Sequence, residues 1–386
     1  MAWPTEALAD LCSINIGRTP SRAESAYWGP GYPWLSIADM NQGRDLQRTK
    51  EQITPLAATK VMVAPTPSGT VMLSFKLSIG KVGISSIPLY TNEAIASLPI
   101  LDSNKLLADY LYWALRSIDF SNDTDRAAMG QTLNKAKLRQ ISVPVPPIDS
   151  QRRIVDVLDR AEGLRIKQRF ATTHLGDLAE SVFIDMFSGG TWPTVAMRDV
   201  SSLITKGTTP TSVGLKFETE GVPFLRVQDL VAGVAVPVAT TLHISKESHQ
   251  ILKRSKIASG DVLVSIAGTI GRIATVPDGL PEMNCNQAVA IVRPTPNLDS
   301  VFAANWLRTD DAKRQMKSGA VTATIANLSL QQVGGLQIPH PPIALQHAFA
   351  EQVARIETIA ATQHERALEL GSLFDSLQHR AFAGRL

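Results

Sequence analysis

The strongest constraint on the fold is an internal repeat, because a series of short motifs occurs twice in the same order. The first copy opens on Trp3-Pro4-Thr5 and the second on Trp192-Pro193-Thr194. The further matches, in chain order, are Thr19-Pro20 with Thr209-Pro210, Tyr32 to Ser36 and Asp39 with Val222 to Arg226 and Asp229, Ser68 to Ser74 with Ser259 to Ser265, Ile79-Gly80-Lys81 with Ile270-Gly271-Arg272, and Asn92 to Ala96 with Asn286 to Ala290. An ordered series of this length indicates duplication, so the chain is two copies of one unit.

The end of each copy matches without gaps. The aligned pairs are Pro144 to Ile148 with Pro339 to Ile343, Gln151 with Gln346, Ser181 with Ser376, and Phe187-Ser188-Gly189 with Phe382-Ala383-Gly384. The duplication therefore covers nearly the whole chain.

Each copy is predicted to be a mixed globular part followed by a long helix. Short apolar runs bounded by Gly, Ser and Pro, such as Thr70 to Phe75 and Asp261 to Ile266, indicate strands. Short helices are expected over Leu106 to Ser117 and Val301 to Lys317. A proline cluster ends each globular part, and about 38 residues without proline follow it. This composition favours one long helix.

Apolar residues recur at heptad a and d spacing along both long helices. They are Ile154, Leu158, Ala161, Leu175, Ala179 and Val182 in the first helix, and Phe349, Val353, Ile356, Ala360, Ala367, Leu370, Phe374 and Leu377 in the second. A helix of this length extends about 57 Å, which is longer than either globular part is wide. An antiparallel helix pair would bury both stripes. The alternative is that each helix packs only on its own globular part.

The fold class that follows is mixed α/β, with two tandem α/β domains separated by two long helices that form an antiparallel coiled coil with pseudo-two-fold symmetry. The chain has 386 residues, of which 44% are hydrophobic and 19% charged, enough for a core in each half and too apolar for a mainly disordered chain. It has no run of about 18 apolar residues that would predict a membrane span. Its two cysteines, Cys12 and Cys285, exclude a disulfide framework and fit a reducing cytoplasm.

On these motifs the chain resembles the specificity subunit of Type I restriction-modification systems. The resemblance rests on the segments Pro146 to Gln151 and Pro341 to Gln346, on the glycine step before an apolar strand, and on the Ile-Gly-basic turn, all in two copies. It implies target recognition domains at residues 1–147 and 190–342 and helical spacer regions at 148–189 and 343–386. The first copy departs from the family pattern at Gly69-Thr70 and at Thr132-Leu133-Asn134, where the second has Gly260-Asp261 and Asn327-Leu328-Ser329.

The resemblance further implies that the chain binds double-stranded DNA at a bipartite site. Each recognition domain would read one half-site, and the helix pair would set a gap of at most roughly 17 base pairs. Methyltransferase (modification) subunits, two from the pseudo-symmetry, and restriction (nuclease-translocase) subunits would join it, with no membrane partner. S-adenosylmethionine, ATP and magnesium would belong to those subunits, and this chain would hold no cofactor.

Motifs for catalysis are missing from the sequence, which predicts no catalytic and no metal-binding residues. Gly80-Lys81 lacks the earlier glycine and the following hydroxyl of a phosphate-binding loop. The proline clusters lack the polar residue and the aromatic residue of the amino-methyltransferase motif. Asp278 to Glu282 is not followed by the lysine that a nuclease motif requires. His243 and His249 are six residues apart, a poor spacing for shared ligands, and are expected at the surface.

The candidate DNA contacts are basic, hydroxyl and amide residues on turns. A formal net charge of +3 is weak, and 38 basic residues cannot all touch DNA. Lysines are expected to meet phosphates, whereas Arg226 and Gln228 are expected to read base edges. The complete set is Arg18, Thr19, Arg22, Arg44, Lys76 and Lys81 in the first copy, and Lys206, Thr208, Thr209, Arg226, Gln228, Lys253, Arg254, Lys256 and Arg272 in the second.

Two other functions fit the sequence less well. A duplicated protein-interaction scaffold with a coiled-coil spacer agrees with the weak overall basicity, but not with the family pattern along the full chain. A self-contained endonuclease would need the acidic and basic residues that are missing. Salt-sensitive, sequence-selective DNA binding separates the first alternative from a DNA-recognition subunit, and magnesium-dependent cleavage by the purified chain would identify the second.

Overall fold

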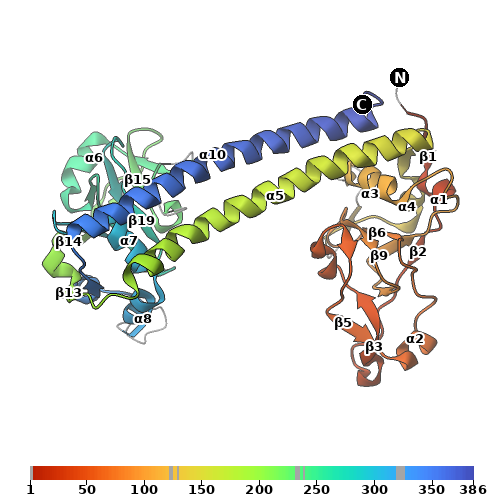
Figure 1. Cartoon of the computed structure of the whole chain (residues 1–386), viewed down its shortest axis with the longest axis horizontal. Coiled ribbons are helices and arrows are strands. Elements are labelled where there is room, and N and C mark those ends of the chain that lie inside the picture. Colours follow the sequence, from red (N-terminus) through yellow and green to blue (C-terminus); the bar gives the residue numbers. More distant parts are fainter. Residues whose placement is uncertain (1–2, 121–124, 128–129, 231–234, 238–239, 319–326) are drawn as a thin grey trace. The chain divides into compact units, whose positions relative to one another are not determined.

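The computed structural model describes residues 3–120, 125–127, 130–230, 235–237, 240–318 and 327–386. The chain divides into two compact units. The first unit comprises Met1–Arg169 together with Arg366–Leu386, and the second comprises Phe170–Glu365. The long helices α5 (Ile148–Phe187) and α10 (Ile343–Phe382) each contribute to both units (Figure 1).

The first unit contains a five-stranded and a three-stranded sheet. The five-stranded sheet has the order β2 (Asn15–Ile16), β9 (Ile95–Leu98), β6 (Val71–Ser74), β7 (Val82–Ser85) and β4 (Asp45–Leu46). The three-stranded sheet has the order β5 (Glu51–Ile53), β3 (Trp28–Leu35) and β8 (Tyr90–Thr91). The other elements are the strand pairs β1 (Thr5–Ala7) with β12 (Ser142–Pro144) and β10 (Asp125–Ala127) with β11 (Gly130–Thr132), and the helices α1 (Leu8–Leu11), α2 (Pro55–Lys60), α3 (Ala108–Arg116) and α4 (Lys135–Gln140).

The second unit repeats this plan with two four-stranded sheets. One has the order β14 (Ser201–Lys206), β21 (Val289–Pro294), β18 (Val262–Ser265) and β19 (Ile273–Thr275). The other has the order β16 (Leu242–Ile244), β15 (Val222–Leu225), β20 (Met283–Cys285) and β17 (Lys256–Ile257). The other elements are the strand pair β13 (Thr194–Ala196) with β22 (Gln337–Pro339), and the helices α6 (Lys246–Ile251), α7 (Ser300–Arg308), α8 (Asp310–Ser318) and α9 (Leu330–Gly335).

The equivalent elements confirm the mixed α/β duplication that the repeat predicts. The pair β6 and β9 corresponds to β18 and β21, and in both units the two strands are antiparallel neighbours. The expected strands Thr70 to Phe75 and Asp261 to Ile266 are β6 and β18. The single helix expected over Val301 to Lys317 is wrong, because the chain breaks into α7 and α8 at Thr309, whose backbone is extended and whose hydroxyl accepts a hydrogen bond from the Ala312 amide.

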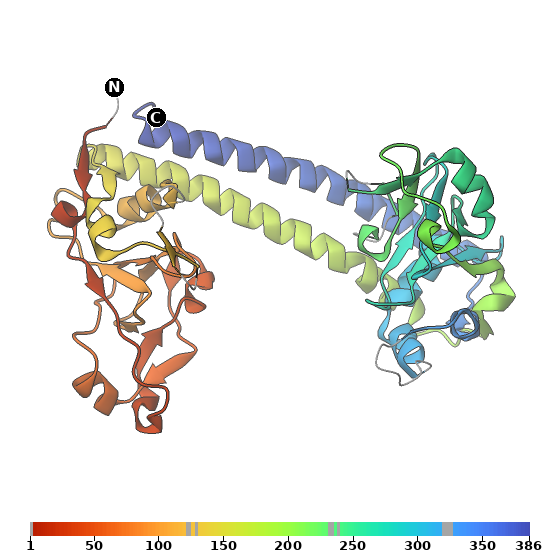
Figure 2. The same ribbon diagram turned by 180° about the vertical axis from the view of Figure 1, so that it is seen from behind.

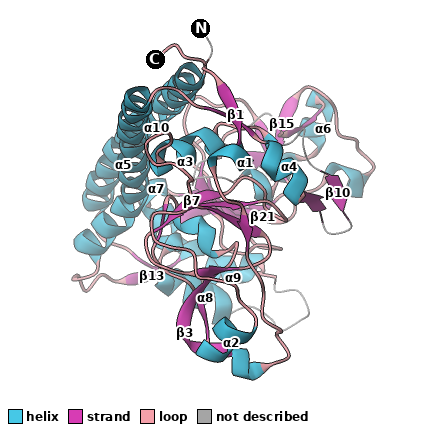
Figure 3. Cartoon of the chain, turned by 90° about the vertical axis from the view of Figure 1, so that its right-hand side faces the viewer, coloured by secondary structure: helices cyan, strands magenta, loops and turns pink. Residues whose placement is uncertain are grey.

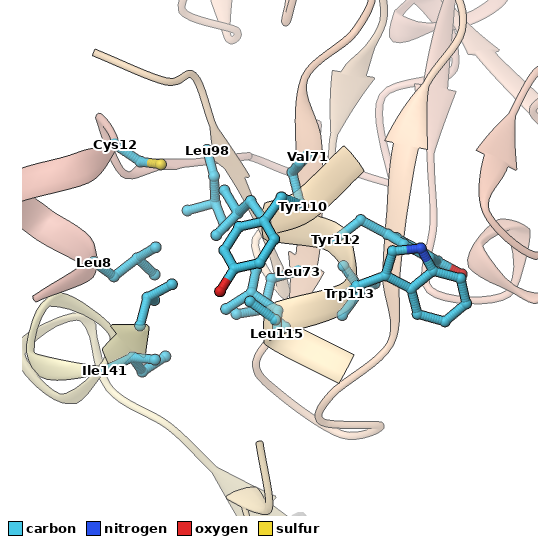
Figure 4. Close-up of a cluster of buried hydrophobic side chains, with 14 of the residues drawn as sticks. Leu8, Cys12, Val71, Leu73, Leu98, Tyr110, Tyr112, Trp113, Leu115 and Ile141 are labelled. Atoms are coloured by element: carbon cyan, nitrogen blue, oxygen red, sulfur yellow. The ribbon is translucent and has the colours of Figure 1, made fainter. Parts of the chain in front are cut away.

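The core of the first unit lies between the five-stranded sheet, α3 and the ends of both long helices. Leu73, Tyr110 and Trp113 are fully buried there (Figure 4). The helix ends supply Leu158 from α5 and Phe374 from α10. The ring of Phe374 lies 5.6 Å from that of Trp113, centroid to centroid.

The second unit contains an aromatic cluster at the corresponding place. Phe183 and Phe187 near the end of α5 pack against Phe302 of α7 and Phe349 near the start of α10. Ring centroids are 5.4 Å apart for Phe183 and Phe349 and 4.9 Å apart for Phe187 and Phe302.

These contacts show that α5 and α10 run antiparallel. In the first unit the start of α5 packs with the end of α10, and in the second unit the end of α5 packs with the start of α10 (Figure 2). Figure 3 shows the two helices side by side, seen more nearly end-on. The helix ends also pack on the globular part of each unit. The helices therefore contact each other and also contribute to the cores of the globular parts.

A buried glutamine fixes the start of each long helix. In α5 the Gln151 side-chain amide donates to the carbonyls of Lys105 (2.8 Å) and Pro146 (2.9 Å) and accepts from the Leu107 amide. In α10 the Gln346 side-chain amide likewise donates to the Pro341 carbonyl at 2.8 Å and accepts from the Asp299 amide at 2.9 Å. Both glutamines are 0% exposed. Within the described part of the chain, no helix combines the length and the apolar composition that crossing a bilayer requires.

Candidate nucleic-acid interface

Each unit presents a tight turn between two antiparallel strands, and this turn carries predicted DNA contacts. The turn between β6 and β7 carries Lys76 and Lys81, and the turn between β18 and β19 carries Arg272. A buried serine holds each turn, because the Lys81 amide donates to Ser74 Oγ (3.0 Å) and the Arg272 amide donates to Ser265 Oγ (2.8 Å). The same backbone frame therefore displays a basic residue in both units.

The two basic side chains reach equivalent backbone carbonyls. Lys81 Nζ lies 3.5 Å from the carbonyl oxygen of Ile37 and donates to Asn41 Oδ1 at 2.7 Å. In the second unit Arg272 Nη1 donates to the carbonyl oxygen of Val227 at 3.3 Å. Both acceptors are neutral, so each side chain keeps a net positive charge at the surface.

The loop that receives Arg272 carries two further predicted residues. Gln228 is exposed in the short 3-10 helix Val227–Asp229. The Arg226 guanidinium is bound to buried Asp229, with Nε 3.1 Å from Oδ2, and it also donates to the carbonyl of Thr240. The structure thus brings Arg226, Gln228 and Arg272 together, with Arg226 engaged inside the protein.

A second loop in each unit passes close to the neighbouring backbone. A Cβ at Gly17 would lie 2.1 Å from the Thr91 carbonyl oxygen, and one at Gly207 would lie 2.0 Å from that of Cys285, so only glycine fits either position. The predicted residues that follow are held locally, since Thr19 donates to Glu93 and Thr209 to Gln287. Of the other residues on these two loops, Arg18 is exposed and donates to the Val61 carbonyl, whereas Lys206 and Thr208 are half-buried.

The remaining predicted residues of the second unit form a basic segment beside β17. Lys253 and Arg254 are exposed, and Lys256 donates to Gln250 Oε1 at 2.9 Å. These three residues lie on the short 3-10 helix Lys253–Ser255 and at the start of β17, and they form a basic segment of the second unit.

Arg22 lies in an aromatic cluster of the first unit. Its guanidinium lies 3.7 Å from the ring centroid of Trp28 and forms a two-pronged ion pair with Glu51. The hydrogen bond from Arg22 lowers the pKa of the Glu51 carboxyl. The charge of Arg22 is therefore largely neutralised where it stands.

Arg44 directly precedes β4 and joins this strand to two helices of the first unit. Its guanidinium forms ion pairs with Asp109 of α3 and with Asp159 of α5, the latter at 2.7 and 2.8 Å. Burial disfavours the charged form of Arg44, but the hydrogen bonds to Asp159 and Asp109 outweigh it and raise its pKa. The Trp113 indole also donates to Asp159 at 2.7 Å.

Arg44 and Lys81 line one groove with a volume of about 840 Å³. The groove also contains Arg48 and Arg116, two cations that sequence reasoning missed. Arg116 lies 3.8 Å from Glu162 of α5. The repeat could have indicated Arg116, because α3 ends at Arg116 and the equivalent helix α7 also ends at an arginine, Arg308.

Metal-binding groups and the two histidines of the sequence motifs can be placed in the structure. No group of three or more His, Cys, Asp or Glu side chains in that part of the chain is placed to hold a metal ion. The expectation that His249 lies at the surface is wrong. Its ring is 2% exposed and is hydrogen-bonded to Asn284 of β20, which fixes α6 on the sheet. Glu282, 3.5 Å from His249 Nε2, is exposed.

Comparisons with known proteins agree with this architecture. Residues 2–169 and 190–370 each match the family described as Type I restriction modification DNA specificity domain. The Type I restriction enzyme MjaIX specificity subunit of Methanocaldococcus jannaschii is 25% identical over 258 residues, covering 61% of this chain and 59% of the relative. The Type I restriction enzyme EcoBI specificity subunit of Escherichia coli is 28% identical over 174 residues, 43% of this chain and 36% of the relative. The chain thus spans less than two thirds of either relative.

Two solved structures share the fold over nearly the full length. The S subunit of a Type I restriction-modification system from M. genitalium gives a TM-score of 0.57 at 15% identity, covering 99% of this chain and 96% of that one. A chain from a study of assembly and conformational transition of the type I R-M system gives a TM-score of 0.64 at 16% identity, covering 100% and 98%. Tandem α/β domains joined by a long helix pair are therefore the fold of this chain.

Proposed function

Because the chain belongs to the Type I restriction-modification DNA specificity family, we propose that it is the DNA-recognition subunit of such a complex and binds a bipartite duplex site. The observation that carries this proposal is the duplicated basic turn, in which Lys81 and Arg272 stand on the same backbone frame and reach equivalent carbonyls. Two copies of one reading surface fit a site with two half-sites.

The surroundings of each predicted contact indicate its role. Lys81 and Arg272 keep their charge and are assigned to phosphates, whose neutralisation makes binding salt-dependent. Gln228 is exposed beside Arg272 and is assigned to a base edge, because a glutamine amide offers both a donor and an acceptor. Arg226 supports this loop through Asp229.

The partner surface proposed for the modification subunits is the set of exposed apolar residues on the long helices. Leu164, Ile166 and Phe170 of α5 are 54 to 66% exposed, and Leu368 and Leu373 of α10 are 62% and 52% exposed. Apolar side chains exposed at this density mark an interaction surface. The pseudo-symmetry of the duplicated chain favours two methyltransferase subunits, which the restriction subunits would join. S-adenosylmethionine, ATP and magnesium would be bound by those subunits. The complex would act in the cytoplasm.

Methylation mapping tests the function in the cell. Genomic methylation is mapped in the source organism with the gene intact, deleted and restored. One split motif should disappear on deletion and return on restoration, which would give both half-sites and the gap. Loss of an undivided motif, or no change in methylation, would reject the proposal.

Duplex binding by the assembled complex tests the contact assignment. Gln228→Ala should reduce discrimination at one position of one half-site by about 1–3 kcal/mol. Arg198→Ala is the matched control, since Arg198 is equally part of the second unit and its side chain is 64% exposed. Equal weakening by Gln228→Ala on all sequences would reject base reading by this residue.

A further inference from the structure

Leu77 has a backbone conformation that leucine rarely adopts. Among the described residues it is the one residue other than glycine with a positive φ, which is 65°. It occupies the centre of a three-residue turn in which the Ser78 amide donates to the Lys76 carbonyl at 2.8 Å. A left-handed conformation is unfavourable for a residue that has a Cβ, and turns of this type are rare and strained.

The frame of the turn imposes this conformation. In the first unit the Gly80 amide donates to the Ser74 carbonyl at 3.0 Å, and in the second unit the Gly271 amide donates to the Ser265 carbonyl at the same distance. The residue of the second unit that corresponds to Leu77 is Gly268, with a φ of 73°. Glycine adopts this conformation without strain, so the second copy shows the ordinary solution and the first copy departs from it.

The leucine side chain obtains no compensation inside the protein. It is 60% exposed and belongs to none of the buried clusters. An exposed apolar side chain on a strained backbone is unfavourable on both counts. Strained residues of this kind cluster at active sites, ligand-binding sites and switch regions.

The neighbours of Leu77 indicate what that contact is. Lys76 directly precedes it, and Lys81 lies at the other end of the same turn. β6 and β7 are inner strands of the five-stranded sheet and their residues are buried, so the turn between them, and not the strands, would approach DNA. A turn that enters the major groove would place lysines near phosphates and an apolar side chain near base edges.

We propose that Leu77 makes an apolar contact with the methyl group of a thymine in the half-site read by the first recognition domain. Thymine is the base that presents an apolar group in the major groove. The inference rests on the proposed function. It also assigns a difference between the half-sites, because Gly268 has no side chain with which to make this contact in the second unit.

The test uses the complex assembled with its methyltransferase subunits and a duplex that carries the mapped site. Each thymine of the first half-site is replaced in turn by uracil, which removes only the methyl group. The wild-type complex should lose affinity at one of these positions, and Leu77→Gly should bind the original duplex about tenfold more weakly. The variant should be indifferent to uracil at that position.

Thermal unfolding separates this contact from a structural role. Leu77→Gly relieves the backbone, so its Tm should equal or exceed that of the wild type. Leu101→Ala is the control, because Leu101 is also 60% exposed in the same unit, and it should change neither affinity nor uracil dependence.

Two failures are distinguishable. Absence of sequence-selective binding by the wild-type complex would overturn the proposed function. Selective binding that is indifferent to uracil at every position, or unchanged by Leu77→Gly, would overturn the contact of Leu77 alone.

Discussion

At the scale of single residues, the groups around a cation determine whether its charge is available to DNA. Arg22 and Arg44 face carboxylates, whereas Lys81 and Arg272 face neutral oxygens. Release of counterions from DNA requires a cation that is not already neutralised. Residues of equal basicity in the sequence are therefore expected to contribute unequally to binding.

A matched pair of substitutions in one groove tests this distinction. Lys81→Gln should reduce the slope of log K against log salt concentration by about 1. Arg44→Gln should leave the slope unchanged and lower the free energy of unfolding by about 1 kcal/mol, because Asp109 and Asp159 lose a partner and all three side chains remain partly exposed. Binding titrations at several salt concentrations and urea unfolding measure the two quantities. Equal loss of slope in both variants would contradict the distinction.

The two cysteines report on the two units separately. Burial raises the pKa of the Cys12 thiol to about 12, and that of Cys285 is also raised. Neither should react with iodoacetamide in the folded protein at pH 7–9, whereas both should react after unfolding in urea.

Above the ordinary thiol pKa of 9.0 the unfolded state loses protons that the native state keeps, so the free energy of unfolding should fall as pH rises from 9. Mass spectrometry of the labelled peptides and urea midpoints at pH 8 and 10 measure these effects, and rapid labelling of native protein would contradict them.

The sequence could predict which residues repeat but not what each repeated residue contacts. The copies differ in sequence around Leu133 and Leu328, yet the Leu133 amide donates to the Phe75 carbonyl and the Leu328 amide to the Ile266 carbonyl, each at 2.9 Å. The residues that follow, Asn134 and Ser329, both cap a helix. The ion pair of Arg44 was beyond prediction because Asp159 lies 115 residues away. Long-range partners depend on the fold, which local spacing does not encode.

At the scale of elements, the start of each long helix depends on one buried glutamine. Gln346→Leu would leave the Pro341 carbonyl and the Asp299 amide without their partner. The expected loss is about 2–3 kcal/mol of unfolding free energy, and Gln151→Leu should cost the same in the first unit. Gln352→Leu, on the exposed face of α10, should change it by less than about 0.5 kcal/mol. Denaturant unfolding measures all three, and similar values for Gln346→Leu and Gln352→Leu would contradict the role of the buried amide.

The long helices were the most predictable elements because their signals are local. Proline clusters and proline-free runs placed them, and α5 and α10 begin at Ile148 and Ile343 as expected. The a and d positions proved buried or half-buried throughout. Phe183 and Phe187 were missed, since their burial depends on Phe302 of a distant helix.

At the scale of the whole molecule, each compact unit is built from parts that are distant in the sequence. The first unit draws on both ends of the chain, and its core includes Phe374 of α10. The core of the second unit includes Phe349 from the same helix. The predicted division into four consecutive segments describes the order of elements along the chain, whereas packing divides each helix between two cores.

This division predicts that substitutions in one helix loosen different units. Phe374→Ala removes a side chain that is 3% exposed, and Phe349→Ala removes one that is 0% exposed; each should cost about 3–5 kcal/mol in its own core. Phe374→Ala should therefore accelerate labelling of Cys12, which belongs to the same core, and leave Cys285 protected, because local opening follows the core that is weakened. Phe349→Ala should leave Cys12 protected, since Phe349 packs in a different core. Leu368→Ala, at a position that is 62% exposed on α10, should change neither rate. Equal acceleration of both cysteines by either phenylalanine variant would show that the two cores open as one.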